Sequence, residues 1–530
     1  MNKIAKYLNQ HLLGEVSAAK SVRNAYSTDG SILTLTPEMV IFPRVTNDIR
    51  KVARFTWQLA EKGHAMPVTA RGGGSNTTGS ALSKGMILDS RVYLNSILTV
   101  AQKEKLAHVQ AGASLESVQA AVKWQGLTLP VVNGRQTVGG AIASASCGDR
   151  DHMDSVVDKL EVVLANGDVI ETGRKSRHEV NKILGHQTFE GEVYRKLSAL
   201  IEDNVDLVNR LEGAMADDSV GYPGISSVRR RDGSMDLTPL FVGSQGTLGI
   251  ISEAVLKLDF FNPNRLAAAI TASSIEQGRD LIDKLYDYNP AQLYLVDGSL
   301  IERAQSYDKT LSIIGDSQTS AAVVVVSFDD HSDRNRLHKF KRMMKYLKTL
   351  NLPVVDSRQH DLTGFDQLID LPKSLARLAE DGEQSPPAFD CVHVPVDRRE
   401  EFASRVIETA DKLHVAMPVV VNGLTGCMTF YPQLKLSSVG DKQKIFKILK
   451  ELNDHAVHHE GTIGSCGAEG RLKAPVAWAS LDKEVVELYE SIRQIFDPFG
   501  TMNPGVKQPV DPRTLVSMLR KSFEASDNIA

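Results

Sequence analysis

Short apolar segments alternate with amphipathic segments between residues 39 and 258, and this alternation predicts strands and helices in turn. Helices are expected over 47–61 and 114–124, where apolar residues recur every three or four positions. Gly63 follows the first of them, at a position where helices commonly end. Strands are expected where β-branched and other apolar residues cluster, at 39–42, 65–70, 85–88, 98–102 and 107–110. This order of elements predicts one α/β or α+β unit.

A second unit is predicted beyond FFNPN (260–264), a stretch typical of a boundary between domains. There the strands are expected at 266–271, 292–296, 321–328, 391–395 and 418–421. The helices are expected at 275–285, 299–307, 334–350, 398–413 and 441–456. The pattern indicates a sheet covered by helices.

Both ends of the chain are expected to be helical. Residues 2–23 have the pattern of an amphipathic helix and lack the continuous apolar core of a signal peptide. The tail after residue 508 can place four apolar side chains on one helical face, Leu515, Met518, Leu519 and Phe523. That face would dock on the protein body or touch a membrane surface. We divide the chain into an N-terminal helical segment (1–36), two domains (37–259 and 260–508) and a tail helix (509–530).

Composition narrows the class of protein. Of the 530 residues, 42% are apolar and 24% are charged, which excludes a disordered, collagen-like or disulfide-scaffold protein. The net charge of -4 argues against nucleic acid as the main partner. The four cysteines lie far apart without a CxxC pair, and no apolar run reaches the length of a membrane span. We therefore expect a cytoplasmic protein with reduced thiols.

The strongest chemical signal is a glycine-rich loop after a predicted strand, RGGGSNTTG at 71–79. Consecutive glycines let backbone N–H groups converge on an anion, and a diphosphate is the natural occupant. The loop lacks the Gly-Lys-Ser/Thr of a P-loop and the GxGxxG spacing of a Rossmann fold. Taken alone, the three glycines fit a flexible surface loop equally well.

Two further segments are rich in small residues. GRQTVGGAIASASCG (134–148) would allow close approach of a flat ligand, or simply tight helix packing. VGSQGTLGIISEAVLKL (242–258) places three glycines before a β-rich run, which an ordinary turn before a strand would also explain. The order and spacing of the three segments carry more information than any one of them.

Together with FDPFGTMNPG (496–505), these segments resemble the FAD-linked oxidases of the vanillyl-alcohol oxidase and p-cresol methylhydroxylase (PCMH) superfamily. Within it they are most similar to the branch of D-lactate dehydrogenases and glycolate oxidases. The resemblance covers residues 37–508 and implies an α+β fold. Residues 37–259 would form a PCMH-type FAD-binding domain of two α+β subdomains. Residues 260–508 would form a ferredoxin-like α+β substrate domain.

The resemblance also implies which residues bind FAD. The glycine-rich loop would cradle the pyrophosphate, the second segment would line the ribityl chain and the isoalloxazine, and the third would contribute main-chain bonds. The implied set is Arg71, Gly72, Gly73, Gly74, Ser75, Asn76, Gly79, Ser80, Thr137, Gly139, Gly140, Ala143, Ser144, Gly148 and Ile251. Relatives that attach flavin covalently often carry histidine directly after the glycines. Ser75 stands there in this chain, so we expect non-covalent FAD.

The second half departs from the family pattern. The family segment GHxGDGNxH supplies two metal-binding histidines, and the matching VVNGLTGCM (420–428) has Val421 and Met428 in their places. The family segment GTxxxEHGDGRLRAP supplies a metal-binding glutamate and a catalytic histidine. The matching GTIGSCGAEGRLKAP (461–475) has Cys466 and Gly467 there. We therefore expect no metal ion and no family general base.

Three residues are candidates for removing the substrate proton or for binding the substrate anion. Oxidation of a 2-hydroxy acid needs a group that removes the hydroxyl proton. Glu469 would serve as that base in a desolvated site, or be a structural carboxylate bonded to backbone N–H groups. Arg471 would attract an anionic substrate, or belong to a solvated basic pair. Lys373 matches the family's carboxylate-binding arginine, although lysine is a poorer bidentate partner.

Cysteine and histidine side chains leave further alternatives open. Cys427 and Cys466 would form a soft metal site with Met428, a disulfide or redox pair, or small buried apolar side chains. His455 and His459 share a helix face, a spacing more often found on surfaces than at metal ions when acidic ligands are lacking.

We therefore expect a flavoenzyme that oxidises a small organic substrate bearing a hydroxyl group, such as a hydroxy acid, by hydride transfer to FAD. It would pass electrons to a quinone, a cytochrome or an electron-transfer protein, in the cytoplasm or loosely at the inner membrane face. The alternative is a flavin-binding electron-transfer or interaction protein that has lost hydroxy-acid dehydrogenase activity.

Overall fold

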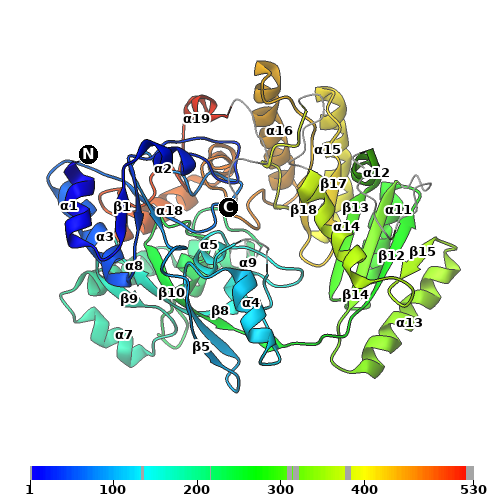
Figure 1. Ribbon diagram of the computed structural model, residues 1–530, viewed down its shortest axis with the longest axis horizontal. Coiled ribbons are helices and arrows are strands. Elements are labelled where there is room, and N and C mark those ends of the chain that lie inside the picture. Colours follow the sequence, from blue (N-terminus) through cyan, green and yellow to red (C-terminus); the bar gives the residue numbers. More distant parts are fainter. Residues whose placement is uncertain are drawn as a thin grey trace. The chain divides into compact units, whose positions relative to one another are not determined.

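The computed structural model describes residues 3–132, 136–214, 217–306, 313, 321–375 and 383–520, and it divides into two compact units (Figure 1). Unit 1 consists of the chain up to Asp259 together with Gly464–Arg520. Unit 2 consists of Phe260–Ile463. Among the described residues, none of the helices combines the length and the apolar character needed to cross a bilayer.

Unit 1 begins with a four-stranded sheet in the order β1-β2-β4-β3. Its strands are β1 (Glu15–Ser17), β2 (Met39–Phe42), β4 (Met86–Asp89) and β3 (Val68–Arg71). The last three are parallel, since helix α3 (Thr46–Glu61) returns the chain from β2 to β3. Apolar residues of these strands and of α3 form a common core, including Ile41, Ile49 and Val52. The glycine-rich loop leaves this sheet at the carboxyl end of β3.

A second sheet of unit 1 has five antiparallel strands in the order β5-β6-β10-β8-β9. They are β5 (Ile97–Ala101), β6 (Leu106–Gln110), β10 (Ile250–Lys257), β8 (Val157–Val163) and β9 (Val169–Glu171). Two short strands are β7 (Leu127–Thr128) and β11 (Asp259–Phe260). Unit 1 thus contains two α+β subdomains.

Helices surround the sheets of unit 1. They are α1 (Lys3–His11), α2 (Lys20–Ala25), α4 (Leu115–Lys123), α5 (Val138–Ala143), α6 (Met153–Val156), α7 (Arg177–Leu184), α8 (Phe189–Asp203), α9 (Val205–Ala214), α10 (Thr238–Phe241), α17 (Ala474–Ala477), α18 (Lys483–Phe496) and α19 (Pro512–Met518). Short 3-10 helices span Pro223–Ser227 and Trp478–Ser480. Although α18 comes late in the chain, it packs on α8, and Figure 1 shows this orange helix among blue and cyan elements.

Unit 2 contains one antiparallel seven-stranded sheet in the order β15-β12-β14-β13-β17-β18-β16. The strands are β15 (Val354–Asp356), β12 (Leu266–Ala272), β14 (Ala322–Phe328), β13 (Gln292–Asp297), β17 (Val419–Asn422), β18 (Cys427–Phe430) and β16 (Val392–His393). Its helices are α11 (Ile275–Tyr286), α12 (Gly298–Ser306), α13 (Asp333–Thr349), α14 (Leu362–Leu375), α15 (Arg399–Leu413) and α16 (Val439–His458), with a 3-10 turn at Val396–Arg398. Every residue of β14 is buried, as its continuous apolar sequence predicts.

The predicted α+β fold class is confirmed: two α+β subdomains build unit 1, and an antiparallel sheet with helices builds unit 2. The N-terminal helix predicted over 2–23 is wrong. Helix α1 ends at His11, and β1 and α2 follow. Gly14 explains the break, because a Cβ there would lie 2.1 Å from the carbonyl oxygen of Phe42 on β2. The buried Asp48 carboxylate holds this turn by accepting the N–H groups of Leu13 and Gly14, both at 2.9 Å.

The ends of the chain join unit 1. Strand β1 pairs with β2, so part of the predicted N-terminal segment belongs to a sheet. Residues 464–508, which we assigned by sequence to the second domain, have their contacts in unit 1. In the tail, the backbone N–H of Thr34 bonds the Met518 carbonyl at 2.8 Å, and Leu515 is buried. Phe523 lies outside the described residues.

Candidate functional site

A cavity lies in unit 1, where its two subdomains meet. Three segments far apart in the chain line it: the glycine-rich loop, the small-residue segment around α5, and the turn that leads into β10. The predicted cofactor residues line this one cavity, with the exception of Gly79 and Gly148. The three patterns seen in the sequence are therefore parts of one site.

The glycine-rich loop is packed too closely for side chains at two positions. A Cβ on Gly72 would lie 2.0 Å from Thr137 Oγ1, and a Cβ on Gly74 would lie 2.5 Å from Arg71 Nη2. Gly74 also has φ +63°, in the left-handed region that favours glycine. These contacts answer the alternative of a flexible surface loop, because the glycines here are required by close packing around a cavity.

Arg71 brings a cationic side chain to the same cavity. Its guanidinium lies 5.1 Å from the ring centre of Tyr26, and burial lowers its pKa, although Asp29 and Asp89 act in the opposite direction. Its buried Nε has no hydrogen-bond partner among the described residues. A buried cation with an unused donor fits an anionic ligand such as a diphosphate.

The small-residue segment forms the wall that the sequence predicts. Thr137 Oγ1 accepts the N–H of Gly140 at 3.2 Å and so fixes the start of α5. Gly139 donates its N–H to the Ala111 carbonyl at 2.8 Å, and a Cβ on Gly139 would lie 2.8 Å from the Ala111 Cβ. This wall therefore tolerates only small side chains, which suits a flat ligand.

The third segment adds a residue that the sequence analysis missed, Gln245. It lines the cavity, and its amide Nε2 donates to Thr78 Oγ1 of the glycine-rich loop at 3.3 Å. The amide Nε2 donates to the Gly467 carbonyl at 3.1 Å, and Oε1 accepts the N–H of Gly470 at 2.9 Å. Its position inside the GSQGTLG motif was the available signal, although the motif alone does not separate Gln245 from its neighbours.

Glu469 sits in a fully buried ion pair. Its Oε2 lies 2.7 Å from Lys507 Nζ, and both side chains are 0% exposed. Its Oε1 accepts the N–H of Gly221 at 2.9 Å and the indole N–H of Trp478 at 2.8 Å. Burial lowers the pKa of Lys507, whereas the Glu469 charge raises it. Both carboxylate oxygens are thus occupied by groups of unit 1, which is the arrangement of a structural carboxylate.

Arg471 is buried on the same loop. Its Nη2 donates to the Leu82 carbonyl at 2.9 Å and to Asn503 Oδ1 at 3.3 Å, and burial lowers its pKa to about 10. Asn503 in turn donates to the carbonyls of Ser80 and Gln245 at 2.8 and 2.7 Å. The FDPFGTMNPG motif therefore links the loop at 464–473 to two walls of the cavity.

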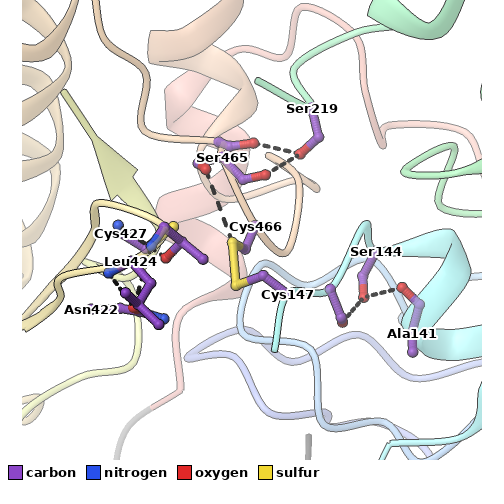
Figure 2. Close-up of a disulfide and its surroundings, with 12 residues drawn as sticks. Ala141, Ser144, Cys147, Ser219, Asn422, Leu424, Cys427, Ser465 and Cys466 are labelled. Carbon is purple, nitrogen blue, oxygen red and sulfur yellow. Dashed lines mark hydrogen bonds between the residues drawn. A yellow bond between two sulfur atoms is a disulfide. The ribbon is translucent and has the colours of Figure 1, made fainter. Parts of the chain in front are cut away.

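A disulfide joins Cys147 to Cys466, with Cα atoms 5.8 Å apart (Figure 2). The expectation that all thiols are reduced is wrong for this pair, and Cys466 is paired with Cys147 and not with Cys427. The bond forms because the loop carrying Cys466 returns to unit 1, where Ser219 Oγ bonds the carbonyls of Gly464 and Ser465. It attaches that loop to the segment that follows Ser144 on the cavity wall.

Other predicted residues fall elsewhere. Val421 and Met428, which we aligned by sequence with the family's metal-binding histidines, are direct partners across β17 and β18 in unit 2, and both are buried. The side chain of Lys373, on α14, lies outside the described residues. Gly79 and Gly148 shape the neighbouring turns without lining the cavity.

Known protein families match both halves of the chain. The family described as FAD binding domain matches residues 37–173, and the family of FAD linked oxidases, C-terminal domain, matches residues 262–506. This chain belongs to the FAD-linked oxidases. The FAD-binding match takes in the glycine-rich loop and the small-residue segment, both of which line the cavity of unit 1.

Individual relatives give the same family. A D-2-hydroxyglutarate dehydrogenase of Pantoea ananatis is 22% identical over 94% of this chain and 50% of its own length. Glycolate oxidase subunit GlcD of Bacillus subtilis is 24% identical over 91% of each chain. The oxidase spans about half the length of the D-2-hydroxyglutarate dehydrogenases that it matches. The crystal structure of p-cresol methylhydroxylase with substrate bound shares the fold, with a TM-score of 0.69, 13% identity and 96% of each chain covered.

Proposed function

We propose that this FAD-linked oxidase is a dehydrogenase that oxidises a small organic acid bearing a hydroxyl group on the carbon next to the carboxylate. The observation that carries the proposal is the cavity lined by three glycine-rich segments with Arg71 beside it. The printed names of relatives matched over most of this chain, D-2-hydroxyglutarate dehydrogenase and glycolate oxidase, support the substrate class. When bound, FAD supplies an acceptor for the hydride from the hydroxyl-bearing carbon.

The chain's own residues prepare the site. Backbone N–H groups of 72–76 and the Arg71 guanidinium would offset the diphosphate charge, because both present donors in a buried place. The wall at Gly139 leaves room for a flat ring system. Ser75 replaces the histidine of covalent relatives, which supports non-covalent binding.

The proposed reaction proceeds without the family's catalytic metal. Val421 and Met428 form an apolar cross-strand pair, and Cys466 is in a disulfide, so these positions offer no imidazole, carboxylate or thiolate ligand. Gly467 has no side chain to act as a base. The hydroxyl proton must then leave to another group or to water.

We assign Glu469 and Arg471 to positioning and Lys373 to substrate binding. Glu469 and Arg471 hold the loop at 464–473 through buried bonds within unit 1. Lys373 would pair with the substrate carboxylate through its ammonium group. Lys373→Met should raise KM for the acid more than it lowers kcat, whereas Lys341→Met on the exposed face of α13 should change neither.

The deciding experiment is anaerobic reduction of the purified oxidase. Visible spectra are recorded while D- and L-2-hydroxy acids and simple alcohols are added in turn. Bleaching of the flavin by a 2-hydroxy acid supports the proposal, and bleaching by dithionite alone contradicts it. A dye acceptor then shows whether electrons leave the flavin. Acid precipitation should release FAD into the supernatant, and a metal chelator should leave turnover unchanged.

A further inference from the structure

A group of metal-ligating side chains lies in unit 2, where the end of α16 packs against α15. Glu401 comes from the first turn of α15, and His458 and His459 come from the end of α16. One ligand atom from each of the three residues lies within 4.8 Å of the others. None of these residues lines the cavity of unit 1 or belongs to the segments that match the family's metal ligands.

His459 has the protonation pattern of a metal ligand. Its Nδ1 lies 2.7 Å from the carbonyl oxygen of His455, which only accepts, so Nδ1 carries the proton. In the neutral ring, Nε2 then presents a lone pair. The side chain is 3% exposed, and this buried Nε2 has no hydrogen-bond partner among the described residues. A carbonyl that fixes the tautomer in this way is the usual outer partner of a ligating histidine.

The lone pair faces a carboxylate and not an apolar wall. Glu401 Oε2 lies 3.7 Å from His459 Nε2, too far for a hydrogen bond but suited to two ligands of one ion. Phe402 packs edge-on against the His459 ring at 6.1 Å and keeps it in place. Glu401 and His458 are exposed, and the His458 ring packs edge-on against the His459 ring at 4.9 Å, which keeps both imidazoles beside the same position.

The neighbouring groups do not compete for this position. His455 Nε2 lies 3.0 Å from Thr409 Oγ1, so the histidine pair on one helix face that the sequence suggests is not the relevant one. Glu460 lies 3.6 Å from Arg398 and is directed to that cation. The candidate ligands at this position are therefore Glu401, His458 and His459.

We propose that Glu401, His458 and His459 bind one divalent transition-metal ion of the zinc type, with water completing the coordination. Two imidazoles and one carboxylate are ligands that Zn²⁺ prefers. The ion would join α15 to α16 in unit 2. This site is independent of the proposed dehydrogenase activity, since none of its ligands lines the flavin cavity.

The test is a zinc titration of the full-length holoprotein without a histidine tag, in competition with a chromophoric chelator. The background is Cys391→Ser/Cys427→Ser, which removes thiol ligands outside the disulfide. We expect one zinc ion to bind per chain. His459→Gln should lower the zinc affinity by at least about 100-fold, because loss of a direct ligand has a larger effect than loss of an outer partner. Glu401→Gln, an exposed substitution that leaves the core untouched, should lower the zinc affinity by at least about tenfold.

Matched controls use the same residue types elsewhere in unit 2. His338→Gln on α13 and Glu408→Gln on α15 are exposed and should leave zinc affinity unchanged. Zinc-edge X-ray absorption should show nitrogen and oxygen ligands only. The proposal is overturned if the chain takes up no zinc at micromolar free metal, if Glu401→Gln binds as tightly as the parent, or if sulfur appears in the zinc shell.

Discussion

The two units of this oxidase differ in how strongly packing restricts their side chains. In unit 1, the cavity depends on positions that have no room for a side chain, since a Cβ on Gly72 or Gly139 would overlap Thr137 or Ala111. In unit 2, the hairpin of β17 and β18 places Val421 directly opposite Met428. A strand pair can carry different side chains at such positions because its backbone bonds do not depend on them.

A cavity held by closely packed loops thus contrasts with a sheet whose backbone pairing does not depend on its side chains. Unit 1 fixes its loops with bonds between distant segments: a disulfide and a buried ion pair. Unit 2 presents side chains on a sheet whose register survives their replacement. Each prediction below tests one side of this contrast.

The largest effect is expected from the buried ion pair of unit 1. Lys507→Met leaves the Glu469 carboxylate without its counter-charge, and Glu469→Gln leaves a buried ammonium. Either change should reduce the free energy of unfolding by about 3–5 kcal/mol, measured by urea titration with flavin fluorescence as the probe of unit 1. The double variant should lose less free energy of unfolding than the more destabilised of the two single variants.

The control for this pair is an exposed one in the same unit. Arg210 lies 3.3 Å from Glu484 with both side chains more than half exposed, so Glu484→Gln should leave the urea midpoint unchanged. If Glu484→Gln and Glu469→Gln lowered the urea midpoint equally, burial would not explain the contribution of the Glu469–Lys507 pair to stability.

The disulfide should contribute the next largest effect. Cys147→Ala opens a link between segments 319 residues apart and should lower stability of unit 1 by about 2–4 kcal/mol. Flavin should also dissociate faster, because Cys147 follows the cavity wall. Cys391→Ala in unit 2 serves as the control. This prediction fails if thiol titration of the unfolded, unreduced protein finds all four cysteines reactive.

A smaller and more local effect is expected at the flavin wall. Gly139→Val forces side-chain atoms into Ala111 and should weaken FAD binding by about 1–3 kcal/mol, which is roughly five- to 150-fold. Equilibrium dialysis against FAD measures it. Gly440→Ala, near the start of α16, adds a Cβ that would make only an ordinary contact with Ser438 Oγ at 3.7 Å, so this variant should bind FAD like the parent. Unchanged affinity in Gly139→Val would remove the wall from the cofactor site.

The smallest effect concerns acid sensitivity of unit 2. Hydrogen bonds from Arg358 hold the pKa of Asp356 below its usual 3.8. A lowered carboxyl pKa stabilises the fold above pH 3.8, and this contribution is lost as pH falls through the folded-state value. Asp356→Asn should therefore lower the free energy of unfolding by about 0.5–1 kcal/mol near neutral pH. It should also make this free energy fall less steeply as the pH is lowered, which far-ultraviolet circular dichroism can follow. An unchanged dependence on acid pH would contradict this prediction.

Local patterns were enough to predict most elements and the segments that line the cavity of unit 1. Helix α3 and strand β14 lie within a residue or two of their predicted bounds, because periodic and β-branched runs specify them without help from distant segments. The glycine-rich segments also marked the cavity locally, because glycines such as Gly72 and Gly139 have no room for a Cβ.

Only the tertiary structure decided which distant residues meet. The return of Gly464–Lys507 to unit 1, the choice of Cys147 as partner for Cys466, and the pairing of Glu469 with Lys507 depend on contacts across tens to hundreds of residues. The approach of Glu401 to His459 depends on how α15 packs on α16. Sequence periodicity reports which face of an element is buried, and it carries no information on which other segment covers that face.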